Sequence, residues 1–120
     1  MKNETLILGA SLNPDRYSNR AIRALKANGF AIKAIGMKDG EVEGVKIQTK
    51  KVAFNSVDTV SLYLNKERQK AYYEYIISLN PRRVIFNPGT ENAEFESLLE
   101  KEGILAEVAC TLVLLSLRQY

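Results

Sequence analysis

The sequence predicts an open, doubly wound α/β domain with a mostly parallel, five-stranded sheet and helices on both faces. Short apolar runs of strand length alternate along the chain with segments whose apolar residues recur at helical spacing. The connections between consecutive strands are long enough to hold a helix, so neighbouring strands are expected to pair in parallel through right-handed crossovers. At 120 residues the chain has the length of one domain, and we expect residues 1–120 to form one.

The first half of the chain contains a strand at residues 5–10, a helix from residues 15–17 to Asn28-Gly29, a strand at 30–36 and a weakly patterned segment at 37–56. The first run, TLILGA, is typical of a strand buried on both faces of a parallel sheet. Asp15 and Ser18 are the candidates for the N-cap of the helix, and Ile22 and Leu25 for its buried face. Within the weak segment, VKIQ is a candidate for an additional strand.

The second half contains a strand at 57–64, a helix at 65–80, a strand at 82–89, a helix at 91–103, a strand at 104–109 and a short closing helix within 110–120. Asn65 is a suitable N-cap, and Asn80-Pro81 stops the helix that Asn65 begins. In the next helix, Phe95, Leu98 and Leu99 are expected to face inward.

Charge and composition exclude several classes of function. The formal charge is 17 − 14 = +3, spread along the chain, which suits an anionic ligand but lacks the basic stripe of a nucleic-acid-binding protein. The absence of histidine excludes His-dependent catalysis and His-containing metal sites. The single cysteine, Cys110, is expected to be buried and structural. Without a signal peptide or a membrane-length apolar run, the chain is expected to be cytoplasmic and to have no membrane or nucleic-acid partner.

The loop after the first strand is the strongest candidate for a binding site, because ligands of open α/β sheets bind beyond the carboxyl ends of the strands. Gly9, Ala10 and Ser11 allow a ligand to approach the backbone, and the following helix offers unpaired N–H groups to an anion. Donors at the same end of the helix come from Arg16, Ser18 and Asn19. The same residues are equally compatible with a tight turn followed by a solvated arginine.

Two further loops bear on the identity of the ligand. The second strand ends at Gly36-Met37-Lys38, where an NAD-binding protein normally has an acid, and the G-x-G-x-x-G spacing is absent. Lys38 would suit a phosphorylated ribose, although the nearby Asp39 keeps NAD open. After the fourth strand, NPGTEN carries Pro88 and Gly89, which form either a second wall of the site or a well-capped turn.

Residues 9–32, GASLNPDRYSNRAIRALKANGFAI, resemble the opening of the small single-domain CoA-binding proteins, which we write as G-A-S-x-x-P-x-R-x-S-N. The similarity continues through VEGVKI, VDTVSLYL, VIFNPG and EVACT and covers nearly the whole chain. This resemblance implies a Rossmann-like CoA-binding domain, related in fold to the nucleotide-binding part of succinyl-CoA synthetases and without catalytic machinery.

The resemblance also implies roles for residues. Gly9, Ala10 and Ser11 would hold the pyrophosphate, with Arg16 and Ser18 on phosphate oxygens, Met37-Lys38 near the adenosine, and Leu64 and Pro88-Gly89 along the groove. Tyr17 and Asn19 belong to the same motif and are included among the predicted cofactor-binding residues. The family often has Asn-Pro after the second strand and an aromatic-Arg pair after the third. Here Gly36-Met37 and Leu64-Asn65 replace them, which leaves room for an altered nucleotide preference.

The predicted function is therefore the non-catalytic binding of coenzyme A or an acyl-CoA. One alternative is an NAD(P)-binding redox enzyme or sensor. Another is a structural or interaction domain whose nucleotide site has decayed. The expected partner is a small nucleotide cofactor, and the sequence leaves a protein partner or homo-oligomer open.

Overall fold

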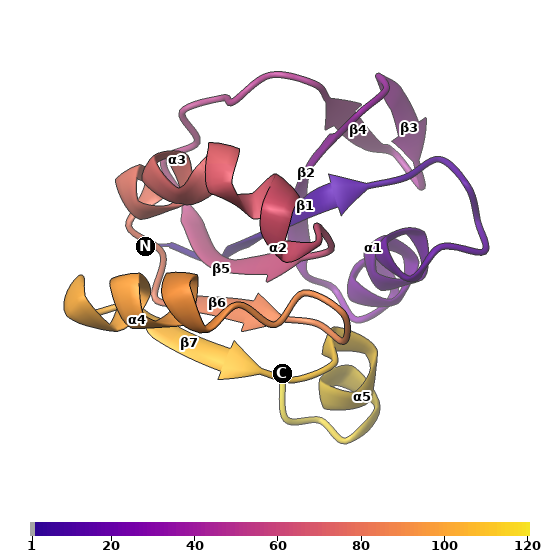
Figure 1. Cartoon of the computed structure of the whole chain (residues 1–120). Helices are drawn as coiled ribbons and strands as arrows, with labels where there is room; N and C mark the ends of the chain where they lie inside the picture. Colours follow the sequence, from indigo (N-terminus) through magenta and orange to yellow (C-terminus); the bar gives the residue numbers. More distant parts are fainter. Residues whose placement is uncertain (1) are drawn as a thin grey trace.

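The computed structural model describes residues 2–120 and contains one seven-stranded sheet between two layers of helices (Figure 1). The strands lie in the order β3-β4-β2-β1-β5-β6-β7, and all pairs are parallel except β3-β4. The strands are β1 (Glu4–Ala10), β2 (Ala31–Gly36), β3 (Gly40–Val42), β4 (Val45–Gln48), β5 (Val57–Leu62), β6 (Arg83–Phe86) and β7 (Leu105–Val108). The α/β class and the mostly parallel sheet are confirmed, but the prediction of five strands is wrong.

The two additional strands form a hairpin at the β2 edge of the sheet. Glu43 and Gly44, both at positive φ, turn the chain between β3 and β4. The hairpin buries Val42, Val45 and Ile47 against the cluster that contains α1. The candidate strand VKIQ is confirmed as β4, and the chain then returns to β5 through residues 49–56 without a helix.

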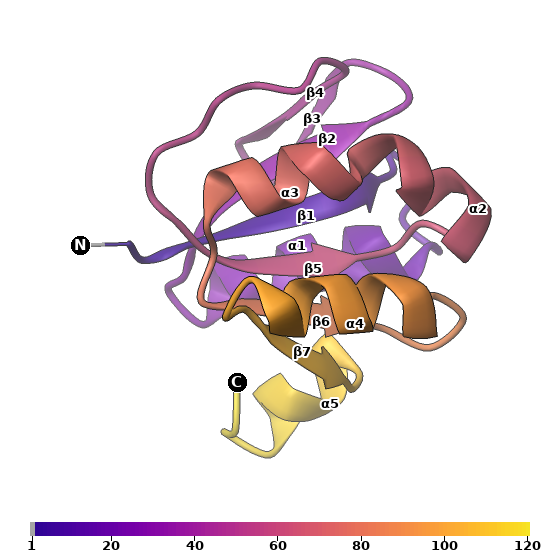
Figure 2. The same cartoon turned by 60° about the vertical axis from the view of Figure 1, so that its left-hand side comes forward.

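The helices cover both faces of the sheet (Figure 2). They are α1 (Tyr17–Ala27), α2 (Lys66–Gln69), a 3₁₀ turn (Lys70–Tyr72), α3 (Tyr73–Leu79), α4 (Ala93–Lys101) and α5 (Thr111–Ser116). One core cluster packs α3 and α4 against the sheet, and the other packs α1 and α5 against the opposite face. Along β1, Leu6 and Leu8 belong to the first cluster and Ile7 to the second, which confirms a strand buried on both faces.

The helix ends agree with the sequence at some positions and differ at others. Asn65 caps α2 by accepting a hydrogen bond from the Arg68 N–H, as predicted, and α1 ends at Asn28 and Gly29. The predicted caps of α1 are wrong, because Arg16 occupies the N-cap and no side chain in residues 2–120 caps this helix. The predicted helix at 65–80 is divided into α2, the 3₁₀ turn and α3.

The inward face of α4 is narrower than predicted. Phe95 and Leu99 are fully buried, whereas Leu98 is 36 % exposed. Residues four positions apart lie above one another on a helix, and α4 contacts the sheet along that single row. Within residues 2–120, every helix is too short or too polar to cross a bilayer.

Candidate functional site

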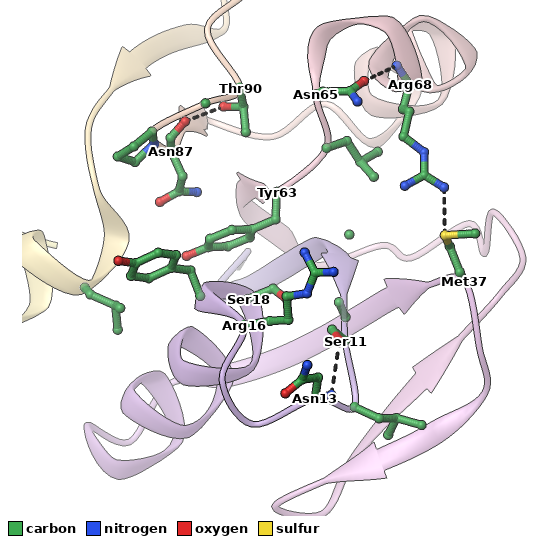
Figure 3. Close-up of a pocket in the computed structure, with 18 of the residues that line it drawn as sticks. Ser11, Asn13, Arg16, Ser18, Met37, Tyr63, Asn65, Arg68, Asn87 and Thr90 are labelled. Atoms are coloured by element: carbon green, nitrogen blue, oxygen red, sulfur yellow. Dashed lines mark hydrogen bonds between the residues drawn. The ribbon is translucent and has the colours of Figure 1, made fainter.

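The topology opens a cavity at the carboxyl ends of the strands. From β1 the chain continues to β2, which lies on one side of β1, and β5 and β6 lie on the other side. The loops after β1 and β5 therefore diverge, which is the arrangement that creates a binding crevice in open α/β sheets. A cavity of about 790 Å³ lies there, lined by the loops that follow β1, β2, β5, β6 and β7 (Figure 3).

The structure brings almost all of the predicted site residues to this cavity. They are Gly9, Ala10, Ser11, Arg16, Tyr17, Ser18, Met37, Lys38, Leu64, Pro88 and Gly89. Asn19 is the exception, because its side chain is buried behind the loop and does not line the cavity. Residues that sequence reasoning missed also line it, namely Leu12, Asn13, Tyr63, Asn65, Arg68, Asn87, Thr90, Cys110 and Leu112.

Gly9 forms the floor of the cavity at the end of β1. Its φ of 99° coincides with a break in the register between β1 and β2. A Cβ on Gly9 would lie 2.9 Å from the carbonyl carbon and oxygen of Tyr63. Glycine is thus required there both by the backbone conformation and by the close approach of the loop after β5.

The start of α1 carries an unneutralised positive end. Arg16 is the N-cap residue, no side chain in residues 2–120 accepts a capping hydrogen bond, and the first turn has no acidic residue. By contrast, asparagine side chains cap both α2 and α4. The free N–H groups of a helix start bind anions, and Arg16 and Ser18 line the cavity beside them.

Ser18 supports an anion site at this position. The residue is only 4 % exposed, yet its hydroxyl has no hydrogen-bond partner among the described residues. No buried side-chain nitrogen or oxygen of the described residues lacks a hydrogen-bond partner, so the Ser18 hydroxyl is accessible from the cavity, where it can donate to a ligand oxygen.

Asn19 positions the loop instead of lining the cavity. Its Nδ2 donates to the Ser11 carbonyl oxygen at 2.9 Å, and its Oδ1 accepts from Arg23 Nε at 2.8 Å. Arg23 also donates to the carbonyl oxygen of Pro14 at 2.8 Å. These bonds fix the β1–α1 loop from behind and hold its backbone toward the cavity.

The charge of the lining is entirely positive. Arg16, Lys38 and Arg68 line the cavity, and no acidic side chain of residues 2–120 does. Arg68 comes from α2, and its direction toward the cavity depends on how α2 packs, which the spacing of the helix did not indicate. The lining therefore favours a ligand with several negative charges.

Asn87 ties three of the loops together beneath the cavity. Its buried Nδ2 donates to Ser61 Oγ and to the Leu62 carbonyl oxygen, each at 2.9 Å. Its Oδ1 accepts from the Thr111 N–H at 2.8 Å. One amide thus joins the ends of β5 and β6 to the start of α5.

Tyr63 and Cys110 also line the cavity. Burial raises the pKa of Tyr63 to about 12, so this phenol keeps its proton at neutral pH. Cys110 is half-buried and lines the cavity, which corrects the expectation of a buried structural cysteine. It occupies the N-cap position of α5.

Comparison with known proteins adds the family to this geometry. A family model described as a CoA binding domain matches residues 3–116. The crystal structure of an uncharacterized protein has 45 % sequence identity and a TM-score of 0.96, with 100 % of this chain and 99 % of that chain covered. No curated protein matches the sequence.

Two more distant structures share the fold. A Thermus thermophilus protein has 20 % identity and a TM-score of 0.87, with 99 % of this chain and 91 % of that chain covered. A dinucleotide-forming acetyl-coenzyme A synthetase from Ca. Korarchaeum cryptofilum, in complex with phosphate and ADP, has 16 % identity and a TM-score of 0.72. The match covers 91 % of this chain and 26 % of the synthetase chain. With the family model matching nearly its full length, the chain belongs to the CoA-binding domain family.

Proposed function

We propose that this protein binds coenzyme A or an acyl-CoA in the cavity at the carboxyl ends of the strands and does no chemistry on it. The observation that carries the proposal is the uncapped start of α1, which lies beside Arg16 and Ser18 in a cavity that no acidic side chain of residues 2–120 lines. Membership of the CoA-binding domain family supports coenzyme A as the ligand. In this proposal, residues 1–120 act as one binding module.

The geometry suggests how the ligand would lie. The pyrophosphate would occupy the backbone of Gly9–Ser11 and the start of α1, where helix N–H groups and the guanidinium of Arg16 can donate to its oxygens. The adenosine would extend toward Met37 and Lys38. Leu64 and the Pro88-Gly89 turn would line the rest of the ligand on the opposite side.

The ionisable side chains of the cavity support a non-catalytic role. In residues 2–120, the lining has neither a carboxylate nor an imidazole that could accept a proton near neutral pH. Tyr63 holds its proton up to a pKa of about 12. Catalysis by a carboxylate or an imidazole would therefore need a group from outside this cavity.

Phosphorylated dinucleotides are the second candidate ligands, because Lys38 lies where dinucleotide-binding proteins contact the ribose. Lys38 would favour NADP over NAD. Asp39, the nearest acid in the sequence, does not line the cavity. An NAD-binding role is therefore the weaker alternative.

Thermal unfolding with CoA, acetyl-CoA, NADP and NAD, compared side by side, tests the proposal. A ligand at a hundred times its Kd adds about 2.7 kcal/mol to the free energy of unfolding. For a domain of this size, that corresponds to a rise in Tm of roughly 8 to 20 °C, since about 1 kcal/mol shifts Tm by roughly 3 to 8 °C. We expect the rise with CoA or acetyl-CoA. A rise with NAD or NADP alone, or with none of the four, would contradict the proposal.

A further inference from the structure

The side chain of Arg68 extends across the cavity to a weak hydrogen-bond acceptor. It lies on α2, which follows β5, and its Nη2 donates at 2.7 Å to Sδ of Met37, in the loop after β2 (Figure 3). Because β2 and β5 flank β1 on opposite sides, this contact passes over the carboxyl end of β1, where Gly9 forms the floor.

The guanidinium of Arg68 is available to a ligand. Arg82 and Arg83 each form an ion pair with a carboxylate, whereas the only recorded side-chain acceptor for Arg68 in residues 2–120 is the thioether of Met37. A thioether is a weak acceptor, and guanidinium has five N–H donors. A phosphate could therefore replace Met37 as the partner at little cost and gain paired, charge-assisted hydrogen bonds.

The position of Arg68 indicates which part of a nucleotide it would meet. In doubly wound dinucleotide-binding proteins, the ribose lies near the end of the second strand. An acidic side chain there accepts a hydrogen bond from a free ribose hydroxyl, whereas an arginine accommodates a ribose phosphate. Here that end is lined by Met37 and Lys38, with Arg68 held against it, and no acid of the described residues lines it. Two cations and no carboxylate among the described residues of the lining favour a phosphate on the ribose.

We propose that Arg68 is a specificity-determining residue that binds a phosphate on the ribose of the ligand and so selects CoA over its dephosphorylated form. This assignment rests on the proposed CoA-binding function. In the bound state, the Arg68 guanidinium leaves Met37 and pairs with the ribose phosphate, while the pyrophosphate lies beside Arg16.

Calorimetric titration with CoA and with 3′-dephospho-CoA tests this role in the wild type and two variants. The wild type should prefer CoA by about tenfold or more, which is the range for a hydrogen bond to a charged group. Arg68→Gln should remove most of that preference and leave the affinity for dephospho-CoA within about twofold of wild type, because the lost contact is only to the extra phosphate.

Two controls separate local contact from other effects. Lys66→Gln removes the same charge from the exposed start of α2, outside the cavity, and should keep the preference for CoA. Thermal unfolding of each variant without ligand should give the Tm of wild type, because Arg68 is exposed.

The outcomes that overturn the assignment are distinct. If Arg68→Gln lowers the affinity for CoA and for dephospho-CoA equally, Arg68 contacts another part of the ligand and the assignment is wrong. Equal binding of CoA and dephospho-CoA by the wild type would overturn the role of Arg68 while the proposed function stands. If the wild type binds neither ligand, the proposed function fails and this assignment fails with it.

Discussion

Asparagine side chains fix the backbone around the cavity. Asn19 holds the β1–α1 loop, Asn87 joins the ends of β5, β6 and α5, and Asn92 links α4 to α2 and α3. An amide both donates and accepts, so each of these residues can join two segments without adding a charge. The positive lining of the cavity is thereby left unneutralised.

Asp58 illustrates a charge that stabilises the fold away from the cavity. Its carboxylate accepts hydrogen bonds from Arg82 Nε and Nη2, each at 3.0 Å, and from Thr59 Oγ1 at 2.8 Å. Partial burial alone would raise the pKa of Asp58, but these hydrogen bonds and the nearby positive charges hold it below its ordinary value of 3.8. Asp58 pairs with its neighbours Thr59 and Arg82 and does not line the candidate site.

We predict that Asp58→Asn lowers the free energy of unfolding at pH 7 and that this difference shrinks as the pH falls below about 4. A folded-state pKa below the unfolded value stabilises the protein above the unfolded pKa, and that stabilisation is lost as the pH falls through the folded pKa. Because Arg82 is largely exposed, the effect at pH 7 should be about 1 kcal/mol or less.

Urea unfolding at pH 7 and pH 3 measures this effect, with Asp39→Asn as the matched control. Asp39 is exposed and forms no recorded ion pair in residues 2–120, so its variant should match wild type at both pH values. The same destabilisation by Asp58→Asn at pH 3 and pH 7 would contradict the assigned role of its charge.

At the scale of helices and strands, the sequence predicted the elements that are long or clearly bounded. The cap at Asn65 and the helix end at Asn28-Gly29 depend on local chemistry, which neighbouring residues determine. The hairpin at residues 40–48 was only partly predicted, because its short strands gain their stability from burial against α1 and β2. The break between α2 and α3 is likewise not evident from helical spacing.

Asn65 and Asn92 are matched caps with different surroundings. Asn65 Oδ1 accepts from the Arg68 N–H at 2.9 Å and is exposed. Asn92 Oδ1 accepts from the Phe95 N–H at 3.1 Å, and its buried Nδ2 donates to Gln69 Oε1 at 3.0 Å. The loss of Asn92 would therefore remove a cap and also leave a buried acceptor without its partner.

We predict that Asn92→Ala lowers the free energy of unfolding by about 2 to 4 kcal/mol, and Asn65→Ala by about 1 kcal/mol. The loss in Asn92→Ala combines the energy of the cap with the cost of an unsatisfied buried group, whereas the loss in Asn65→Ala comes from the cap alone. Urea unfolding without ligand measures both. Equal losses in the two variants would show that the link from Asn92 to Gln69 contributes nothing to stability.

At the scale of the whole molecule, the order of elements was sufficient to predict the class of fold and the place of the site. Alternating strands and helices imply a doubly wound sheet, and such a sheet binds ligands where its strand order reverses. The cavity lies there. The residues contributed by other loops, such as Arg68 and Asn87, could not be predicted, because their directions depend on how α2 and α5 pack.

If the start of α1 holds the phosphates of CoA, the loss of Arg16 should weaken CoA binding. Arg16→Ala should leave the fold intact, because Arg16 is exposed, and should remove one charge-assisted hydrogen bond to the ligand. Arg20→Ala is the matched control. Arg20 is exposed on the next turn of α1, lies over the Tyr17 ring and does not line the cavity.

Calorimetric titration of CoA into the wild type, Arg16→Ala and Arg20→Ala is therefore the most direct measurement. Loss of a hydrogen bond to a charged group costs about 1.5 to 3 kcal/mol, so Arg16→Ala should weaken CoA binding roughly 10- to 150-fold. Arg20→Ala should stay within about twofold of wild type. Unchanged affinity in Arg16→Ala, or an equal loss in both variants, would contradict a phosphate site at the start of α1.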